Sequence, residues 1–257
     1  MRGRRLRVLV TGGGSGIGLG IATHFAERGH AVCLTDVEAG AVERAAGELR
    51  GRGCAATGLQ LDVTSATDID AVVASLAPDG PDLLVNNAGL QHVSTLEEFP
   101  RQRWELLVAV MLTGSAMLTR AVLPGMRRRG FGRIVNVGSI HSLVASPYKS
   151  AYVAAKHGLI GFAKTVALET ADTDVTINTV CPSYVRTPLV DAQITAQAKA
   201  HGIPEQQVIE EIMLRPMPKR AFVTIEELGG IVEFLASDVA RNVTGQWIAV
   251  DGGWTAQ

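Results

Sequence analysis

A tyrosine, a lysine and a serine in one short stretch of the sequence could together carry out acid–base chemistry. Tyr152 and Lys156 are four residues apart. The segment Ala151–Ala167 has helical periodicity, which places both side chains on one helix face. An ammonium beside a phenol favours the phenolate and lowers the pKa of Tyr152, which suits a general acid or base. Ser139 follows the apolar run Ile134–Val137 and could offer its hydroxyl to the same reacting oxygen. The pattern suits a carbonyl–alcohol interconversion, although an ordinary solvated Tyr–Lys pair would look the same.

The first part of the chain contains the kind of unit that such a site needs, a strand, a turn, a helix and a second strand. Apolar runs predict strands over Leu6–Val10 and Ala31–Thr35, with a helix over Leu19–Arg28 between them. The first turn reads T-G-G-G-S-G-I-G. Its glycines let the backbone pass close to a pyrophosphate, and the helix N-terminus supplies unpaired N–H groups. We expect a dinucleotide cofactor to bind at Thr11, Gly12, Ser15, Gly16, Ile17 and Gly18.

An acidic residue at the end of the second strand indicates which dinucleotide this is. Asp36 lies 20 residues beyond Gly16, where a carboxylate would accept hydrogen bonds from ribose hydroxyls. The same carboxylate would repel a 2′-phosphate, and the next residues are Val37 and Glu38 rather than an arginine. We therefore expect NAD rather than NADP. The alternative is a plain surface aspartate after a strand.

Two further predicted strand ends would extend the cofactor crevice, because parallel sheets bind ligands at the carboxyl ends of their strands. The third and fourth strands are expected over Ala55–Asp62 and Asp82–Val85. The residues that follow them add Asp62, Val63, Asn87, Ala88 and Gly89 to the predicted cofactor site. Read alone, the Asn-Asn-Ala-Gly run would be a polar turn.

The rest of the chain alternates between helix and strand. Helices are expected over Glu38–Arg50, Ser65–Leu76, Arg101–Arg129 (broken at Pro124) and Thr224–Ser237, and strands over Arg133–Val137, Val175–Val180 and Trp247–Val250. This order predicts an α/β fold, a single Rossmann-like, doubly wound parallel sheet with helices on both faces, in one domain over residues 1–257. A poorly periodic segment, about 188–222, is expected to be a helical lid inserted over the site.

Composition narrows the possible partners. The 257 residues are 47% hydrophobic and carry a formal net charge of -1. The chain therefore lacks the excess of positive charge that is typical of a nucleic-acid-binding protein. We expect no membrane-spanning segment and no signal peptide. Cys33, Cys54 and Cys181 have no metal-ligand spacing, so no metal site is expected. A reducing cytoplasm is the expected location.

Taken in order, these motifs resemble the short-chain dehydrogenase/reductases across essentially the whole chain. The resemblance rests on Thr11–Gly18, Asn86–Gly89, Ser139 and the Tyr152-x-x-x-Lys156 pair. It implies hydride transfer between nicotinamide and a carbinol carbon, with Tyr152 as acid/base, Ser139 holding the substrate oxygen, and Lys156 holding the nicotinamide ribose. It also adds Val185 and Thr187 to the cofactor site, and it implies a homotetramer.

A narrower resemblance is to bacterial D-3-hydroxybutyrate dehydrogenases. It rests on Gln91-His92, on 141–146, 149–158, 185–190 and 193–194, and on the ending 251–257. It implies that a substrate carboxylate is held by Gln91, His141, Lys149 and Gln193, beside Ser139 and Tyr152. A cation and several N–H donors around a small anion make chemical sense in a closed, partly dry pocket. Read singly, Lys149 and Gln193 would be solvated surface residues and His141 a polar loop residue.

Two positions depart from the wider family. Met111 stands where many members carry an asparagine that orders a water of the proton relay, so we expect a backbone carbonyl near Met111 to take over. Ser183 replaces the glycine usual after Cys-Pro. The sequence thus favours an NAD-dependent (R)-3-hydroxybutyrate dehydrogenase. The alternatives are a dehydrogenase of another small hydroxy acid, a sugar acid or a 3-ketoacyl substrate, and a catalytically silent NAD(H) sensor.

Overall fold

The structure, a computed structural model, describes residues 4–76, 78 and 80–256 of the chain. Within these residues the fold is built on a seven-stranded sheet in the order β3-β2-β1-β4-β5-β6-β7, with every neighbouring pair parallel. The strands are β1 Arg7–Thr11, β2 Ala31–Asp36, β3 Ala56–Gln60, β4 Leu83–Asn86, β5 Phe131–Val137, β6 Asp174–Pro182 and β7 Trp247–Val250. The predicted doubly wound parallel sheet is confirmed.

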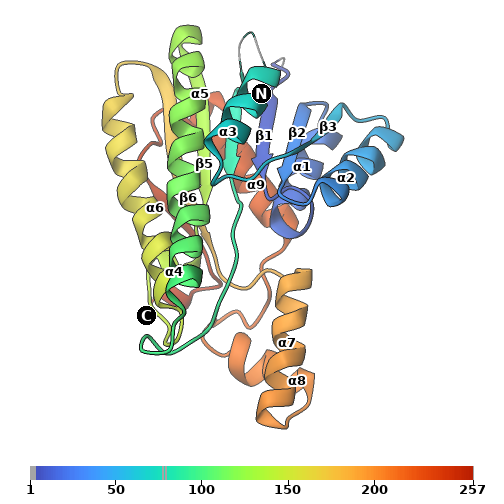
Figure 1. Cartoon of the computed structure of the whole chain (residues 1–257), viewed down its shortest axis with the longest axis vertical. Helices are drawn as coiled ribbons and strands as arrows, with labels where there is room; N and C mark the ends of the chain where they lie inside the picture. Colours follow the sequence, from blue (N-terminus) through green and yellow to red (C-terminus); the bar gives the residue numbers. More distant parts are fainter. Residues whose placement is uncertain (1–3, 77, 79, 257) are drawn as a thin grey trace.

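Helices cover both faces of the sheet, as Figure 1 shows. One face packs against α1 (Gly16–Glu27), α2 (Ala39–Gly51) and α9 (Ile225–Ala236), and the other against α3 (Ala66–Ser75), α5 (Ser115–Arg129) and α6 (Ser150–Glu169). The two layers bury separate apolar clusters, because the strands of a sheet covered on both faces are apolar on both sides. Phe25 lies in the first cluster and Leu118 in the second, each with 0% of its surface exposed.

The long helix predicted over Arg101–Arg129 consists of α4 (Arg101–Val108), a π-helical turn over Ala109–Gly114 and α5. The predicted break at Pro124 is wrong, since α5 continues through the proline. The irregularity lies instead at the π-helical turn, a kind of turn that is frequent near functional sites.

The same helix bears on the expectation that no segment spans a membrane. By length and composition it could cross a membrane, with a mean hydropathy of 1.9 over its most apolar 18-residue window. However, 39% of that window is buried against the rest of the protein, and core helices pass the same test. Leu107, Met111, Leu118, Val122 and Met126 all face the interior. The apolar pattern is therefore explained in part by packing.

The segment expected to be a lid stands apart from the two main layers in Figure 1. It contains α7 (Pro188–His201), the single turn α8 (Glu205–Gln207) and a π-helical turn over Val208–Met213. It has its own small apolar cluster around Ile194 and Met213. Its two ends lie side by side, because Val185 and Val223 form a parallel bridge and Val223 N–H donates to the Tyr184 carbonyl over 2.9 Å. The segment therefore leaves and rejoins the body of the protein at one place.

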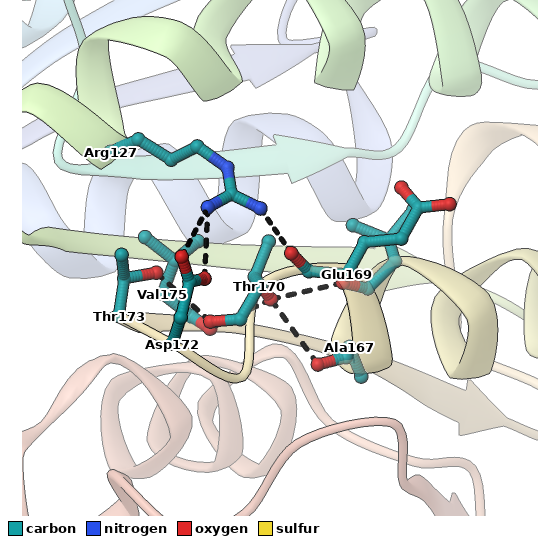
Figure 2. A network of polar contacts seen from close by, with 8 residues as sticks. Arg127, Ala167, Glu169, Thr170, Asp172, Thr173 and Val175 are labelled. Carbon is teal, nitrogen blue, oxygen red and sulfur yellow. Dashed lines mark hydrogen bonds and ion pairs between the residues drawn. The ribbon is translucent and has the colours of Figure 1, made fainter.

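At the opposite end of the molecule, polar contacts tie α5 to the turn between α6 and β6 (Figure 2). Arg127 donates to both carboxylate oxygens of Asp172, over 2.9 and 3.1 Å, and to the Glu169 carbonyl. The fully buried Thr170 hydroxyl donates to the carbonyl of Val175, over 3.1 Å. These contacts hold α6, which carries Tyr152 and Lys156, against its neighbours.

Candidate active site

The sheet places a cavity where its strand order reverses, between β1 and β4. In open α/β sheets this is the point where ligands bind. The cavity has a volume of about 610 Å³. Most of the predicted site residues line it: Gly12, Ser15, Gly16, Ile17, Asp36, Asp62, Val63, Asn87, Ala88, Gly89, Gln91, Ser139, His141, Lys149, Tyr152, Lys156, Val185, Thr187 and Gln193. Residues from distant parts of the chain, α7 included, thus meet at one site.

Thr11 and Gly18, also predicted to bind the cofactor, lie behind the cavity wall and shape it. The Thr11 hydroxyl accepts hydrogen bonds from the backbone N–H groups of Asn87 and Ala88, over 2.9 and 3.0 Å. A Cβ added at Gly18 would lie 2.2 Å from the Gly12 carbonyl oxygen. These contacts require glycine at the start of α1 and join the turn after β1 to the turn after β4.

The Gly-rich turn fits a dinucleotide phosphate group. Gly12 has φ +61° and Gly16 has φ +56°, conformations that glycine adopts readily. The N-cap of α1, Ser15, makes no side-chain cap hydrogen bond, so N–H groups of the first helical turn are available to an anion. Thr187, the N-cap of α7, stands against the open side of Gly16.

Asp36 is held in a fixed orientation at the far end of this turn. One of its carboxylate oxygens accepts from Gly14 N–H over 3.1 Å, and the other accepts from Glu38 N–H over 3.2 Å. Each oxygen retains lone pairs for further donors. Because the carboxylate lines the cavity, it can accept hydrogen bonds from hydroxyl groups of a bound ligand.

Ser139, Tyr152 and Lys156 meet at the carboxyl end of β5. Lys156 is 5% exposed and donates to the Val137 carbonyl over 2.6 Å, with its Nζ 5.7 Å from the centre of the Tyr152 ring. Ser139 caps a short 3₁₀ turn by accepting from His141 N–H over 3.1 Å. The three side chains that the sequence analysis placed at one site therefore lie together in the structure.

The predicted effect of Lys156 on Tyr152 is wrong for this structure. Burial raises the pKa of Tyr152, although a hydrogen bond with Ser139 opposes the rise. Burial also lowers the pKa of Lys156 to about 8. Desolvation disfavours the charged form of both groups, and the Lys156 ammonium donates to the Val137 carbonyl.

The four residues expected to hold a carboxylate surround the neighbouring part of the cavity. Burial and, second, the charge of Lys149 lower the pKa of His141 to about 4, so His141 is neutral. Its Nδ1 is buried with no partner among the described residues. Burial lowers the pKa of Lys149. The Gln91 side-chain oxygen accepts from His92 N–H over 3.2 Å, which leaves the Gln91 amide N–H groups as donors. An anion would relieve the desolvation of Lys149.

An aromatic wall beside these residues was missed from the sequence. Tyr184 and Trp254 stack with ring centres 6.2 Å apart, and the rings of Trp254 and His141 meet edge to face with their centres 6.1 Å apart. Asp251 fixes the Trp254 turn by accepting from the backbone N–H groups of Gly253 and Thr255. Tyr184 follows the end of β6, at the ligand-binding edge of the sheet, and that position was the available signal.

Of the two departures from the family pattern, Ser183 lines the cavity and Met111 lies behind Gly89, which lines it. The buried Met111 side chain packs beside Gly89, and its backbone carbonyl accepts from the Ser115 hydroxyl over 2.9 Å. The expected role of a carbonyl here in ordering a relay water stays a prediction. Ser183 lines the cavity and donates its backbone N–H to Val250 over 3.0 Å, which joins β6 to β7.

Comparison with known proteins identifies the family. A sequence model of the short chain dehydrogenase family matches residues 7–198. The chain belongs to the short-chain dehydrogenase family. It is 44% identical to a D-beta-hydroxybutyrate dehydrogenase of Rhizobium meliloti (97% of this chain, 98% of the relative) and 46% identical to that of Cupriavidus necator (97% of each). A crystal structure of a variant of actinorhodin polyketide ketoreductase with NADPH matches with a TM-score of 0.92 and 33% identity, over 98% of each chain.

As a short-chain dehydrogenase, the protein is an oxidoreductase that binds a nicotinamide dinucleotide and acts on a small molecule. The glycine turn, Asp36 and the strand-end residues provide a site of suitable chemistry for that dinucleotide. The ketoreductase structure contains NADPH, so family membership does not by itself select NAD.

Proposed function

We propose that this protein is an NAD-dependent dehydrogenase that interconverts (R)-3-hydroxybutyrate and acetoacetate. The observation that carries the proposal is a cation beside the reactive residues: Lys149 lines the same cavity as Ser139, Tyr152 and Lys156, and burial lowers its pKa. A short 3-hydroxy acid has a carboxylate two bonds away from its carbinol carbon, so one small molecule could meet both groups. The identity with two D-beta-hydroxybutyrate dehydrogenases supports this assignment.

Each residue has a role in this proposal. Lys149 supplies the charge that holds the carboxylate, while Gln91, His141 and Gln193 donate hydrogen bonds to it. When bound in its oxidised form, the nicotinamide supplies a hydride acceptor and a positive charge. In oxidation the substrate hydroxyl gives its proton to the oxygen of Tyr152, and the C3–H bond breaks as the C=O bond forms. In reduction Tyr152 returns that proton.

Ser139 and Lys156 support the reacting oxygen and the cofactor. The Ser139 hydroxyl donates to the oxygen as its charge changes, which stabilises the transition state most where water is excluded. Lys156, held by the Val137 carbonyl, is placed to donate to the nicotinamide ribose. Tyr184, which lines the cavity and stacks on Trp254, helps to exclude water from this part of it.

NAD is the proposed dinucleotide because Asp36 faces the ribose end of the cavity. Its carboxylate would accept from the two hydroxyls of NAD and repel the 2′-phosphate of NADP. The exposed residue after it, Val37, offers no charge to a phosphate. Asp36→Ala should therefore weaken NADH binding and bring the affinities for NADH and NADPH closer together.

The test is NADH formation with (R)-3-hydroxybutyrate, its (S) enantiomer and lactate, each with NAD or NADP. Turnover with only the (R) form and NAD supports the proposal. Lys149→Ala should raise KM for the substrate by about 10²-fold, since truncating one partner of a buried charge pair costs several kcal/mol. Lys164→Ala, an exposed lysine on the same helix, is the matched control. Turnover of a larger hydroxy acid or a 3-ketoacyl thioester instead, or NADH binding without turnover of any substrate, would overturn the substrate assignment.

The proposal extends to the assembly and its parts. The chain acts as one catalytic domain in the cytoplasm, and four copies form a homotetramer. The segment 188–222 acts as a lid, because it carries Gln193 and leaves and rejoins the body between Val185 and Val223. Closure would bring Gln193 onto the substrate carboxylate.

A further inference from the structure

A strained residue lies next to Lys149. Tyr148 has φ +66°, and among the described residues it is one of two non-glycine residues with positive φ. An L residue with a Cβ adopts this conformation at a cost, and a bulky side chain there persists only where the surroundings impose it. The Tyr148 side chain is 57% exposed, so its own packing does not explain the conformation.

The local sequence shows how the strain arises. Pro147 precedes Tyr148, and a proline followed by a residue with positive φ is typical of a type II turn. Glycine or asparagine normally takes that third position. The turn ends at Lys149, the N-cap of α6, which has φ −124° and ψ 32°. The direction in which Lys149 leaves the turn is therefore set by the conformation of Tyr148.

The carbonyl of Tyr148 connects this turn to a second loop of the site. It accepts a hydrogen bond from Ser94 N–H over 3.0 Å. Ser94 lies three residues after Gln91, and both Gln91 and Lys149 line the cavity. The next carbonyl, that of Lys149, accepts from Val153 N–H over 2.9 Å as part of the first turn of α6. The Tyr148 carbonyl thus joins the two loops that carry these cavity residues, and the Lys149 carbonyl joins the second loop to α6.

We propose that Tyr148 is a positioning residue: its left-handed backbone directs its carbonyl to Ser94 and thereby holds Lys149 and Gln91 at the spacing a small carboxylate needs. The proposal deepens the proposed function, on which its kinetic part rests. The side chain of Tyr148 has no part in it. Residues that accept positive φ should therefore replace tyrosine without weakening substrate binding. Residues that resist positive φ should weaken it.

The experiment compares four variants. Tyr148→Gly and Tyr148→Asn accept positive φ, Tyr148→Val resists it, and Tyr148→Phe is the control that keeps the strain and the ring. We expect Tyr148→Val to raise KM for (R)-3-hydroxybutyrate about tenfold, with KM for NAD changed less than about twofold, because substrate positioning alone is affected. The Gly, Asn and Phe variants should keep the wild-type KM for the substrate. If Tyr148→Val does not fold, Tyr148→Ala makes the same comparison with a smaller effect.

A second measurement does not depend on the substrate. The charge of Lys149 is one cause of the low pKa of His141, so a displaced Lys149 should let that pKa rise. Titration of the His141 ring signal by NMR, assigned with His141→Gln, should show a higher pKa in Tyr148→Val than in Tyr148→Gly. Equal His141 pKa values in all four variants would overturn the proposal. A raised pKa in Tyr148→Val together with no turnover by the wild type would overturn only the proposed substrate.

Discussion

At the residue scale, burial rather than the proximity of Tyr152 and Lys156 determines the protonation state of these two reactive groups. Tyr152 is favoured as a neutral phenol, and the pKa of Lys156 is lowered to about 8. A neutral phenol is ready to donate a proton in ketone reduction, whereas alcohol oxidation requires the phenolate. The positive charge of an oxidised nicotinamide would favour that phenolate. The protein alone therefore presents the acid form of the site.

Tyr152→Phe tests this assignment. Removing the phenolic oxygen should lower kcat in both directions by about 10²–10⁴-fold, the usual contribution of a general acid or base. NADH binding, measured by fluorescence titration, should change little, because Lys156 and Asp36 remain. In the wild type, kcat/KM for oxidation should rise with pH through the neutral range, since the raised pKa of Tyr152 leaves little phenolate there. Oxidation by Tyr152→Phe at the wild-type rate would contradict the role.

His141 gives a prediction about stability. Its pKa is about 4 in the folded protein, against the ordinary value of 6.5. Between these values the unfolded chain binds more protons, so the contribution of neutral His141 is present above pH 6.5 and is lost as pH falls towards 4. At pH 5 the loss is about 2 kcal/mol. His141→Gln should remove it.

The measurement is urea unfolding of the wild type and His141→Gln at pH 8 and pH 5. Between pH 8 and pH 5 the wild type should lose about 2 kcal/mol more of its free energy of unfolding than the variant does. Asp82 and Asp251, whose pKa values are also lowered in the fold, destabilise both proteins equally in acid and so cancel in the comparison. Identical losses would show that His141 is protonated in the folded protein.

At the element scale, the site depends on how closely α1 approaches the turn after β1. Gly18→Ala would place its Cβ 2.2 Å from the Gly12 carbonyl oxygen and 2.5 Å from Asn87 Nδ2. The turn and Asn87 would have to move, so NADH binding should weaken at least about tenfold. Gly230→Ala in α9 is the matched control, because nothing lies within 4 Å of its added Cβ. It should bind NADH normally and be more stable by about 0.5–1 kcal/mol. Normal NADH binding by Gly18→Ala would show that the turn is not the cofactor cradle.

The elements also show what the sequence could and could not predict. The strands of the sheet, the glycine turn and the Tyr152–Lys156 pair could be predicted because each depends on residues that are close in the sequence. Strands show in the apolar runs, the turn in its glycines, and the pair in its four-residue spacing. The stacking of Tyr184 on Trp254 joins residues 70 positions apart and has no such signal. The pKa of Tyr152 was predicted in the wrong direction because the spacing shows the nearby ammonium but not the burial of both groups. The π-helical turn at Ala109–Gly114 was missed because Pro124 was the more obvious helix breaker.

At the scale of the whole molecule, the residues of the proposed site lie at the carboxyl ends of several strands and on α7. Asp36 ends β2, Asn87 follows β4 and Ser139 lies just beyond β5, while Gln193 comes from the lid segment. A bound dinucleotide would therefore span the two halves of the sheet. The outer face of α5, one of the helices that support the site, remains partly apolar and exposed.

That exposed face carries the final prediction. Met117 on α5 is 40% exposed, within a helix of which most of the apolar window is unburied. Exposed apolar stripes of this kind mark protein contacts, and most soluble oligomers are symmetric assemblies of one chain. Light scattering after size exclusion should give about four times the chain mass of 27.1 kDa for the wild type. Met117→Glu should lower that mass by placing a charge in the interface, whereas Ala39→Glu, an exposed position at the start of α2, should not. A monomeric wild type, or a tetramer unaffected by Met117→Glu, would show that this face is not the interface.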